Sequence, residues 1–341
     1  MKFLKWFLLV GLMVVGIGAY VGYSMLRGAN VAPSKDGHTL FIPSGSVYEE
    51  VVTSLVDKGI IKNETSFRKV AELKKYPQLV KAGKYKIKSG WSNTQLVNHL
   101  RLGTQEPVKV VINQARTIDK FVSAATRDLE ADSTVLISLL NDADYVQSLG
   151  FNDKTIIGLF IPDTYQFNWN TSEKEVVDRM VNEYKKFWND ERLAQAKKMN
   201  MTPEEVSTLA SIVDEETYHT EEMDDVAGVY LNRLERGISL DADPTVKFAM
   251  GDPTIKRVLL KHLEVDSPYN TYRNAGLPPG PICLPSKQAL EAVLNPAEHD
   301  YIYFCAKPDF SMYHAFATNL REHNLNAKRY HNALNRKKIF R

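Results

Sequence analysis

The longest apolar run of the chain lies at its N-terminus. From Trp6 to Leu26 the sequence WFLLVGLMVVGIGAYVGYSML carries no charged residue, and a helix of that length can cross the hydrocarbon core of a bilayer. A cleaved signal peptide has a shorter apolar region, followed by a small-residue cleavage site. Residues 1–27 therefore predict a single transmembrane anchor with a short cytoplasmic end, and the small, polar stretch 28–36 predicts a linker.

Residues 37–105 combine strand-like and helix-like patterns in a short space. HTLFIP and KAGKYKIKSG predict strands, whereas SVYEEVVTSLVDKGII and TSFRKVAELKKY place apolar residues at helical spacing. SNTQLVNHLRLG predicts a third helix, with Ser92 as its N-cap and Gly103 as its stop. We expect a small α+β module that binds or positions rather than catalyses.

Residues 106–341 predict a larger α+β domain. The strand-like VKVVINQ opens it, and helical patterns follow around 118–149 and 172–198. After further helices, loops rich in proline and glycine lead to a strand pair near 300–318. The predicted fold class is therefore α+β in both modules, preceded by a transmembrane helix.

The stretch MTPEEVSTLASIVDEET carries a complete set of helix-start signals. Thr202 can cap the helix, Pro203 suits its first position, and Glu205 can return a hydrogen bond to the cap. Because each helical residue advances about 100° around the axis, this start sets the direction of every following side chain. The apolar stripe then comprises Val206, Leu209, Ala210, Ile212 and Val213.

Three acids end this helix, and the rotation sends only one of them toward the core. Glu216 falls on the apolar stripe, whereas Glu215 points nearly the opposite way and Asp214 to the side, both toward solvent. A carboxylic acid partly buried against aliphatic groups has a raised pKa, which suits a general acid working near neutral pH. The alternative is a structural glutamate satisfied by an arginine or by backbone donors.

Charge and cysteine content exclude several kinds of protein. The chain has 43 lysines and arginines against 41 aspartates and glutamates, so no net field draws it to nucleic acid. Cys283 and Cys305 lack the spacing of a metal site or redox motif, and no metal or cofactor is expected. We expect a buried free thiol at Cys305, while a disulfide between the two cysteines stays open.

A polar stretch and a stiff loop lie farther along the chain. Asp243 is placed to cap a short helix and Pro244 to begin it. Tyr269, Asn270 and Tyr272 then precede a loop stiffened by glycine and proline. Aromatic and amide groups on a stiff loop suit carbohydrate recognition by stacking and hydrogen bonding, and they also suit an ordinary structured loop.

Several separated motifs occur in one order between Ala210 and Asn324. They are ASIVDEET, VYLNRL, DADPTV, SPYNTY, GLPPGPI and HAFATNLREHN. In order and approximate spacing they resemble the signature of the MltG/YceG-like endolytic murein transglycosylases. GLFIPDTYQF (158–167) resembles the strand segment ahead of that family's catalytic helix, and residues 37–105 more loosely resemble its membrane-proximal LysM-like module.

The resemblance implies cleavage of peptidoglycan glycan strands between N-acetylmuramic acid and N-acetylglucosamine, with a 1,6-anhydro sugar at the product end. The family's catalytic glutamate carries over to Glu216, and Asp214 takes a supporting position where glutamate is usual. The direction of the side chain and the resemblance thus select the same acid. The candidates for binding the substrate are Asp243, Thr245, Tyr269, Asn270, Tyr272, His314 and Asn319.

One carboxyl group suffices for such a reaction, because the C6 hydroxyl of the sugar itself attacks C1. Most glycosidases instead use a second carboxylate to activate water or to act as the nucleophile. Two other interpretations stay open. The chain could be a muramidase-type hydrolase with a second acid such as Asp214 or Asp243, or a non-catalytic, membrane-anchored cell-wall binding or scaffold protein.

The sequence also leads to predictions of where the protein lies in the cell and what it binds. Lys2 and Lys5 precede the apolar run, which favours an orientation with the N-terminus inside and the catalytic domain on the extracytoplasmic side of the cytoplasmic membrane. The resemblance implies peptidoglycan glycan strands as substrate and the membrane-embedded glycan-synthesis machinery as partner, with the enzyme ending nascent strands. The sequence indicates no nucleic-acid partner and no oligomeric state.

Overall fold

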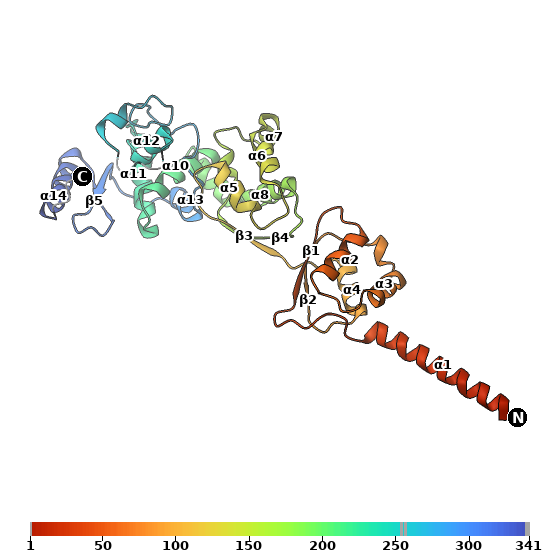
Figure 1. Cartoon of the computed structure of the whole chain (residues 1–341). Coiled ribbons are helices and arrows are strands. Elements are labelled where there is room, and N and C mark those ends of the chain that lie inside the picture. The colour runs from red at the N-terminus through yellow and green to blue at the C-terminus, as the bar shows by residue number, and fades with distance from the viewer. Residues whose placement is uncertain (1, 253–254, 256–257, 338–341) are drawn as a thin grey trace. The chain divides into compact units, whose positions relative to one another are not determined.

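The computed structural model describes residues 2–252, 255 and 258–337. Two compact units make up the chain. The first contains Met1–Val110, Thr126–Ala131 and Gln166–Ser172, and the second contains Val111–Ala125, Asp132–Tyr165 and Glu173–Arg341. Figure 1 shows that helices and strands are mixed along the chain. The predicted α+β fold class is thereby confirmed.

Helix α1 (Lys2–Arg27) carries apolar side chains on its surface. Leu12 is 70% exposed and Tyr20 is 73% exposed. The segment Trp6–Arg27 is long and apolar enough to cross a membrane. Apolar surface left in water costs about 25 cal/mol per Å², so the helix fits the predicted single-pass anchor.

A small sheet and three helices share one core in the first unit. Strand β1 (His38–Ile42) runs antiparallel to β2 (Gly83–Ile87). The helices are α2 (Tyr48–Asp57), α3 (Glu64–Leu73) and α4 (Asn93–Leu102), with a 3-10 turn, η1 (Tyr76–Gln78). Leu40 of the sheet and Phe67 and Leu96 of the helices are completely buried in this core.

The predicted ends of α4 are confirmed. Ser92 is the N-cap, and its hydroxyl accepts a hydrogen bond from the amide of Gln95. Gly103 follows the last turn with a positive φ of 76°, a conformation that costs a glycine little. Local signals therefore set the bounds of this helix.

The second unit contains most of the helices. In chain order they are α5 (Ile118–Thr126), α6 (Ser133–Asn141), α7 (Ala143–Ser148), α8 (Glu173–Phe187), α9 (Asp190–Lys198), α10 (Pro203–Glu216), α11 (Met223–Glu235), α12 (Asp243–Met250), α13 (Lys287–Leu294) and α14 (Leu320–Arg336), with 3-10 turns η2 (Ile156–Leu159), η3 (Thr220–Glu222) and η4 (Leu260–Glu264). Strand β3 (Val108–Ile112) pairs with β4 (Asp163–Phe167).

The helices predicted around 118–149 and 172–198 are confirmed, and each of these regions contains more than one helix. Residues 118–149 form α5, α6 and α7, and residues 172–198 form α8 and α9. New N-caps within these regions divide them into separate helices. The side chains of Asp132, Asp142 and Asn189 each accept a backbone N–H, so a new helix begins after each of them.

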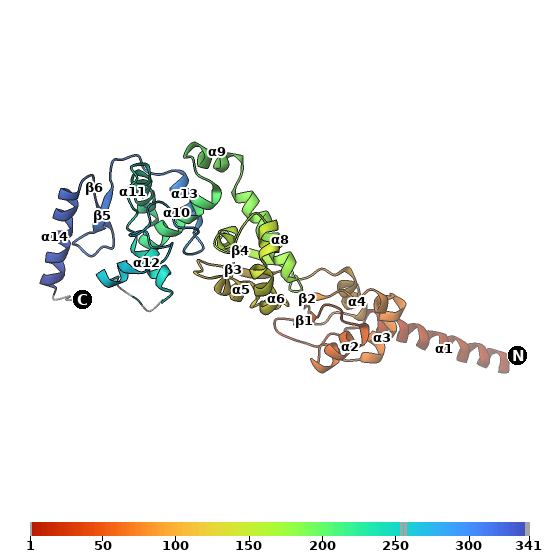
Figure 2. The ribbon, with the colours of Figure 1, turned by 90° about the horizontal axis from the view of Figure 1, so that it is seen from above.

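Helices α10, α11 and α13 pack around one core and lie side by side in both views (Figures 1 and 2). Leu209 of α10, Val226 of α11 and Leu290 of α13 have no exposed surface. Burying such a side chain contributes about 1.5–3 kcal/mol relative to leaving it in water. The last turn of α10 is thereby held on a rigid support.

A hairpin and a helix follow near the C-terminus. Strand β5 (Tyr303–Ala306) runs antiparallel to β6 (His314–Ala317), with Tyr303 opposite Ala317. The predicted strand pair near 300–318 is therefore confirmed. Helix α14 packs against both strands, and β5 also contacts α11, which brings the hairpin to the end of α10.

Candidate active site

The start of α10 has the predicted capping box. The Thr202 hydroxyl accepts from the Glu205 amide at 3.2 Å, and the Glu205 carboxylate accepts from the Thr202 amide at 2.8 Å. The whole apolar stripe is completely buried, as the rotation predicted: Val206, Leu209, Ala210, Ile212 and Val213. The helix ends at Glu216, so its last side chain is placed by a start and a stripe that the sequence determines.

The carboxyl group of Glu216 points toward the core. The hydroxyl of Tyr230, from the facing helix α11, donates to Glu216 Oε1 at 2.7 Å. Burial raises the pKa of the Glu216 carboxyl to about 7, and the charge of Asp243 adds to the shift, whereas the Tyr230 hydrogen bond and the Lys247 ammonium lower the pKa. The carboxyl group can therefore be protonated and deprotonated near neutral pH.

The other two acids do not point freely into solvent, which corrects the expectation from helix rotation. Asp214 is 7% exposed and accepts from the Ser286 amide at 2.7 Å and from the Ser286 hydroxyl at 2.9 Å. Glu215 forms an ion pair with Arg116 and keeps 15% of its side chain exposed. Neighbouring segments cover these faces of the helix end, so one helix alone could not show their surroundings.

Glu216 opens into a cleft of about 370 Å³. Its lining residues come from α10, α11, the loop before α12, the first residue of α12, the loop after η4, the β5–β6 hairpin and α14: Glu216, Tyr230, Arg233, Leu240, Asp241, Asp243, Tyr272, Tyr303, Phe304, Cys305, Ala306, His314, Leu320 and His323. Three of the predicted binding residues, Asp243, Tyr272 and His314, are among them. The cleft thus combines segments from across the second half of the chain.

Asp243 and Tyr272 form a polar pair in this cleft. The Tyr272 hydroxyl donates to Asp243 Oδ1 at 2.8 Å. Burial and the charge of Asp243 raise the pKa of the Tyr272 hydroxyl, which therefore stays protonated and remains a donor. Asp243 is the first residue of α12 and not its cap, because Ala242 occupies the cap position and Asp243 already has helical geometry. The prediction of a cap at Asp243 is therefore wrong, and the residue instead lines the cleft.

The other predicted binding residues do not line the cleft within the described residues. Thr245 is completely buried and donates to the Ala242 carbonyl at 2.7 Å. Asn270 is also completely buried, and its amide donates to the Leu263 and Val265 carbonyls. Both side chains hold together the backbone that carries Asp243 and Tyr272.

Tyr269 and Asn319 likewise have local partners. The ring of Tyr269 packs on Phe248, with 4.6 Å between the ring centroids. Asn319 is the N-cap of α14 and accepts from the Glu322 amide at 3.0 Å. Among the residues that the structure describes, these contacts give each side chain a structural role beside the cleft.

Arg233 and Asp241 form part of the cleft wall and were missed by the sequence reasoning. Arg233 donates to the Ser239 carbonyl at 2.8 Å and to the Ile302 carbonyl at 2.9 Å, and pairs with Asp241. Asp241 has a positive φ of 50°, which is uncommon for a residue other than glycine. The one available signal was the spacing of three between Tyr230 and Arg233, which puts both on one helical face.

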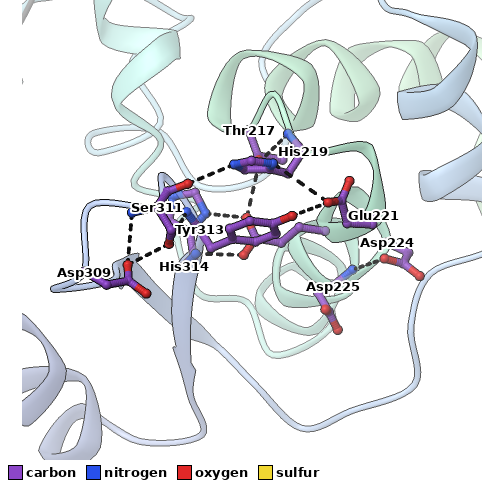
Figure 3. A network of polar contacts seen from close by, with 10 residues as sticks. Thr217, His219, Glu221, Asp224, Asp225, Asp309, Ser311, Tyr313 and His314 are labelled. Carbon is purple, nitrogen blue, oxygen red and sulfur yellow. Dashed lines mark hydrogen bonds and ion pairs between the residues drawn. The ribbon is translucent and has the colours of Figure 1, made fainter.

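A polar network joins the turn after α10 to the β5–β6 hairpin (Figure 3). The His219 ring stacks on Tyr313 at 3.7 Å between centroids, and His219 Nε2 lies 3.1 Å from the Ser311 carbonyl oxygen. The Tyr313 hydroxyl donates to Glu221. These contacts connect the loop of the hairpin to the turn that follows the helix of Glu216.

Both cysteines are free thiols. Cys283 is completely buried, and Cys305 is partly exposed and lines the cleft. The expectation of a buried thiol at Cys305 is therefore wrong. The strand β5 has no fully buried residue, and all four of its residues line the cleft.

Comparisons with known proteins agree with these motifs. The model of the YceG-like family matches residues 40–329. A protein named endolytic murein transglycosylase from Bacillus subtilis (strain 168) is 28% identical, over 95% of this chain and 93% of its own length. Its namesake from Streptococcus pneumoniae serotype 2 (strain D39 / NCTC 7466) is also 28% identical over 95% of this chain, which spans 64% of that longer protein.

A solved structure shows the same fold. The crystal structure of a yceG-like protein from Listeria monocytogenes is 30% identical in sequence, with a TM-score of 0.58. The match covers 86% of this chain and 99% of the other. The similarity therefore extends over most of the chain and is not confined to the motifs around the cleft.

Proposed function

The chain belongs to the YceG-like family, and from this premise we propose that it is an endolytic murein transglycosylase, the activity for which its relatives from Bacillus and Streptococcus are named. Its substrate is the glycan strand of peptidoglycan, and the bond that it cleaves joins N-acetylmuramic acid to N-acetylglucosamine. The observation that carries this proposal is a single carboxyl group, Glu216, with a pKa of about 7 in a cleft beside further polar side chains.

Glu216 acts first as the general acid and then as the base. The protonated carboxyl group donates its proton to the glycosidic oxygen, and the bond between that oxygen and C1 of N-acetylmuramic acid breaks. The C6 hydroxyl of the same sugar bonds to C1, and its proton passes to the Glu216 carboxylate. No water is consumed, the product ends in a 1,6-anhydro sugar, and the carboxyl group regains its starting state.

The intramolecular attack explains why one acid suffices. A hydroxyl tethered to the reacting ring has a high effective concentration, and such tethering supplies several kcal/mol of the barrier. Tyr230 supports the first step, since its hydrogen bond at 2.7 Å stabilises the carboxylate that forms when Glu216 gives up its proton. The site therefore needs no second carboxylate to bring in and activate water.

Polar side chains of the cleft contact the sugars. We assign the sugar contacts to Asp243, Tyr272 and His314, which line the cleft together with Glu216. Thr245, Tyr269, Asn270 and Asn319 support the cleft from behind, through the loop before α12, the Tyr272 segment and the start of α14. A carboxylate, a phenol and an imidazole suit the hydroxyl and acetamido groups of amino sugars.

Helix α1 anchors the protein in the cytoplasmic membrane with its N-terminus inside. Residues 37–105 form a LysM-like module, and residues 106–341 form the catalytic domain on the extracytoplasmic side. There the enzyme ends nascent strands beside the glycan-synthesis machinery. The exposed apolar surface of α1 and the separate core of the β1–β2 unit support this arrangement.

The decisive test is the product of cleavage. Full-length protein in detergent is incubated with purified glycan strands, beside Glu216→Gln and the control Glu235→Gln, which makes the same chemical change at an exposed position at the end of α11. We expect anhydro-ended fragments, detected by mass, from the parent and from Glu235→Gln. Glu216→Gln should lose at least about a hundredfold in rate, as removal of a general acid does.

Two outcomes would replace the proposal. Ordinary reducing ends from the parent would make the protein a hydrolase, and Asp243 would then be the second acid to test, because it lines the cleft with Glu216. Glycan that binds without being cleaved, by parent and variants alike, would make it a cell-wall binding or scaffold protein with a structural Glu216.

A further inference from the structure

Glu222 is a buried acid that the proposed mechanism does not use. It lies at the junction of η3 and α11, and only 4% of the residue is exposed. Its carboxylate accepts from the Thr217 hydroxyl at 3.2 Å and from the His314 amide at 2.7 Å. His314 Nδ1 lies 2.8 Å from the same oxygen that Thr217 contacts. Burying a carboxylate is costly, and these partners offset the cost only while all of them donate.

This arrangement determines which ring nitrogen of His314 carries the proton. An ionised carboxylate can only accept hydrogen bonds, so Nδ1 must be the donor to Glu222. In the neutral ring the other nitrogen, Nε2, is then an acceptor. Because one carboxylate holds both the His314 amide and Nδ1, the ring is also fixed in its orientation.

The opposite edge of the ring belongs to the cleft. His314 lines it together with Glu216 and keeps 13% of its side chain exposed. Phe304, also on the cleft wall, packs edge to face on the His314 ring at 5.1 Å and on the Tyr230 ring at 5.7 Å. Within the described residues, Nε2 has no protein partner.

We propose that Glu222 is a positioning residue: it holds His314 with the proton on Nδ1, so that Nε2 accepts a hydrogen bond from a hydroxyl or acetamido N–H of the bound amino sugar. This inference rests on the proposed function, since it assigns a recognition role within the same cleft. A site built to accept from a sugar donor leaves a buried acceptor unpaired when that contact is lost, which weakens transition-state binding.

Glu222→Gln tests the positioning directly. A glutamine keeps the size of the side chain but offers one carbonyl oxygen to three donors, and its NH2 group is itself a donor. An amide that donates to Nδ1 moves the ring proton to Nε2, so the nitrogen that faces the sugar becomes a donor. Glu221→Gln is the matched control, because Glu221 is the adjacent acid in the same network, is exposed, and contacts Tyr313 (Figure 3).

Kinetics of the full-length protein provide the first readout. We expect kcat/KM for glycan cleavage to fall about tenfold in Glu222→Gln and in His314→Gln, the size expected for one lost hydrogen bond, and to stay within about twofold in Glu221→Gln. The double variant Glu222→Gln/His314→Gln should be no slower than His314→Gln, because Glu222 acts through that ring. Losses that multiply in the double variant overturn the proposal.

The proton on the ring provides a second readout that a merely structural role would not move. In protein labelled with ¹⁵N-histidine, the His314 signals are those absent from His314→Gln. We expect the parent to carry its proton on Nδ1 and Glu222→Gln to carry it on Nε2. A parent ring protonated on Nε2, or on both nitrogens at the pH of the assay, overturns the proposal.

The two proposals fail in different ways. A parent that makes no anhydro-ended fragments contradicts the proposed function, whatever the tautomer. A parent that makes them, with Glu222→Gln equally fast, contradicts only the role of Glu222. If Glu222→Gln loses its thermal unfolding transition, the proposal for Glu222 is judged by two other results: the tautomer of His314 in the parent and the kinetics of His314→Gln.

Discussion

At the scale of single residues, the acidity of Glu216 connects function to stability. Burial raises the pKa of its carboxyl group from 4.5 to about 7, so the folded state favours the protonated form. Its stabilising contribution is fully present below about pH 4.5 and is lost as the pH rises through about 7. Above that pH the charge on this partly buried carboxylate lowers the free energy of unfolding by up to about 3 kcal/mol, relative to its value below about pH 4.5.

We therefore predict two effects of pH. Because the first step needs the protonated acid, kcat/KM of the parent should fall about tenfold per pH unit above about pH 7. Glu216→Gln cannot ionise, so its melting temperature should rise relative to that of the parent between pH 5 and 8. Thermal unfolding of both proteins across this range measures the difference, with Glu235→Gln as the control.

The melting temperatures also separate a catalytic acid from a structural one. A structural glutamate, satisfied as an ion, would stabilise the fold most at high pH, and its replacement would then lower the melting temperature. A Glu216→Gln variant that is less stable than the parent at pH 8 would contradict the catalytic assignment, even if it were inactive.

At the scale of elements, Asp214 connects α10 to the start of α13. Both of its oxygens accept from Ser286, which is the N-cap of α13. These hydrogen bonds connect two helices that pack around the same core. It accounts for an acid at the end of an apolar helix without any chemical role.

Asp214→Asn should therefore lower stability and leave the chemistry intact. An asparagine has one acceptor oxygen for two donors, and its NH2 group faces a donor, which costs about 1–3 kcal/mol. We expect a lower melting temperature and, well below it, cleavage at close to the parent rate. Urea denaturation and the glycan assay measure the two effects.

Glu215→Gln is the control for this prediction. Its ion pair with the half-exposed Arg116 is of a kind that contributes at most about 1 kcal/mol. Loss of cleavage in a stably folded Asp214→Asn variant would instead support the hydrolytic interpretation, with Asp214 as its second acid.

At the scale of the whole molecule, the apolar surface of α1 predicts how the protein is held in the cell. The full chain should sediment with membranes and resist both high salt and alkaline washing, because its contact is apolar. A variant that lacks residues 2–27 should be soluble and should release the same anhydro-ended fragments. Cell fractionation followed by the glycan assay tests both statements.

The orientation has its own test. Protease added outside spheroplasts should degrade the catalytic domain of the full-length protein, whereas a cytoplasmic marker protein should survive. Protection of the domain until the membrane is opened would reverse the orientation. Release of the full chain by salt alone would show that α1 lies on the membrane surface instead of spanning it.

The sequence by itself determined the features that depend on neighbours along the chain. The capping box at Thr202, the stop at Gly103 and the buried stripe of α10 were all predictable, because helix starts, stops and periodicity are local. The same periodicity placed Glu216 toward the core, and the order of the motifs indicated the family that the comparisons show.

Only the tertiary structure decided which side chains surround Glu216. Asp214 is buried because Ser286 covers it, 72 residues farther along the chain, and His314 is held by Glu222 across 92 residues. Thr245 and Asn270 support the backbone because their own segments fold around them. No local pattern encodes such pairs: each forms when the packing of apolar faces brings distant segments together, and the polar groups buried there must then find partners.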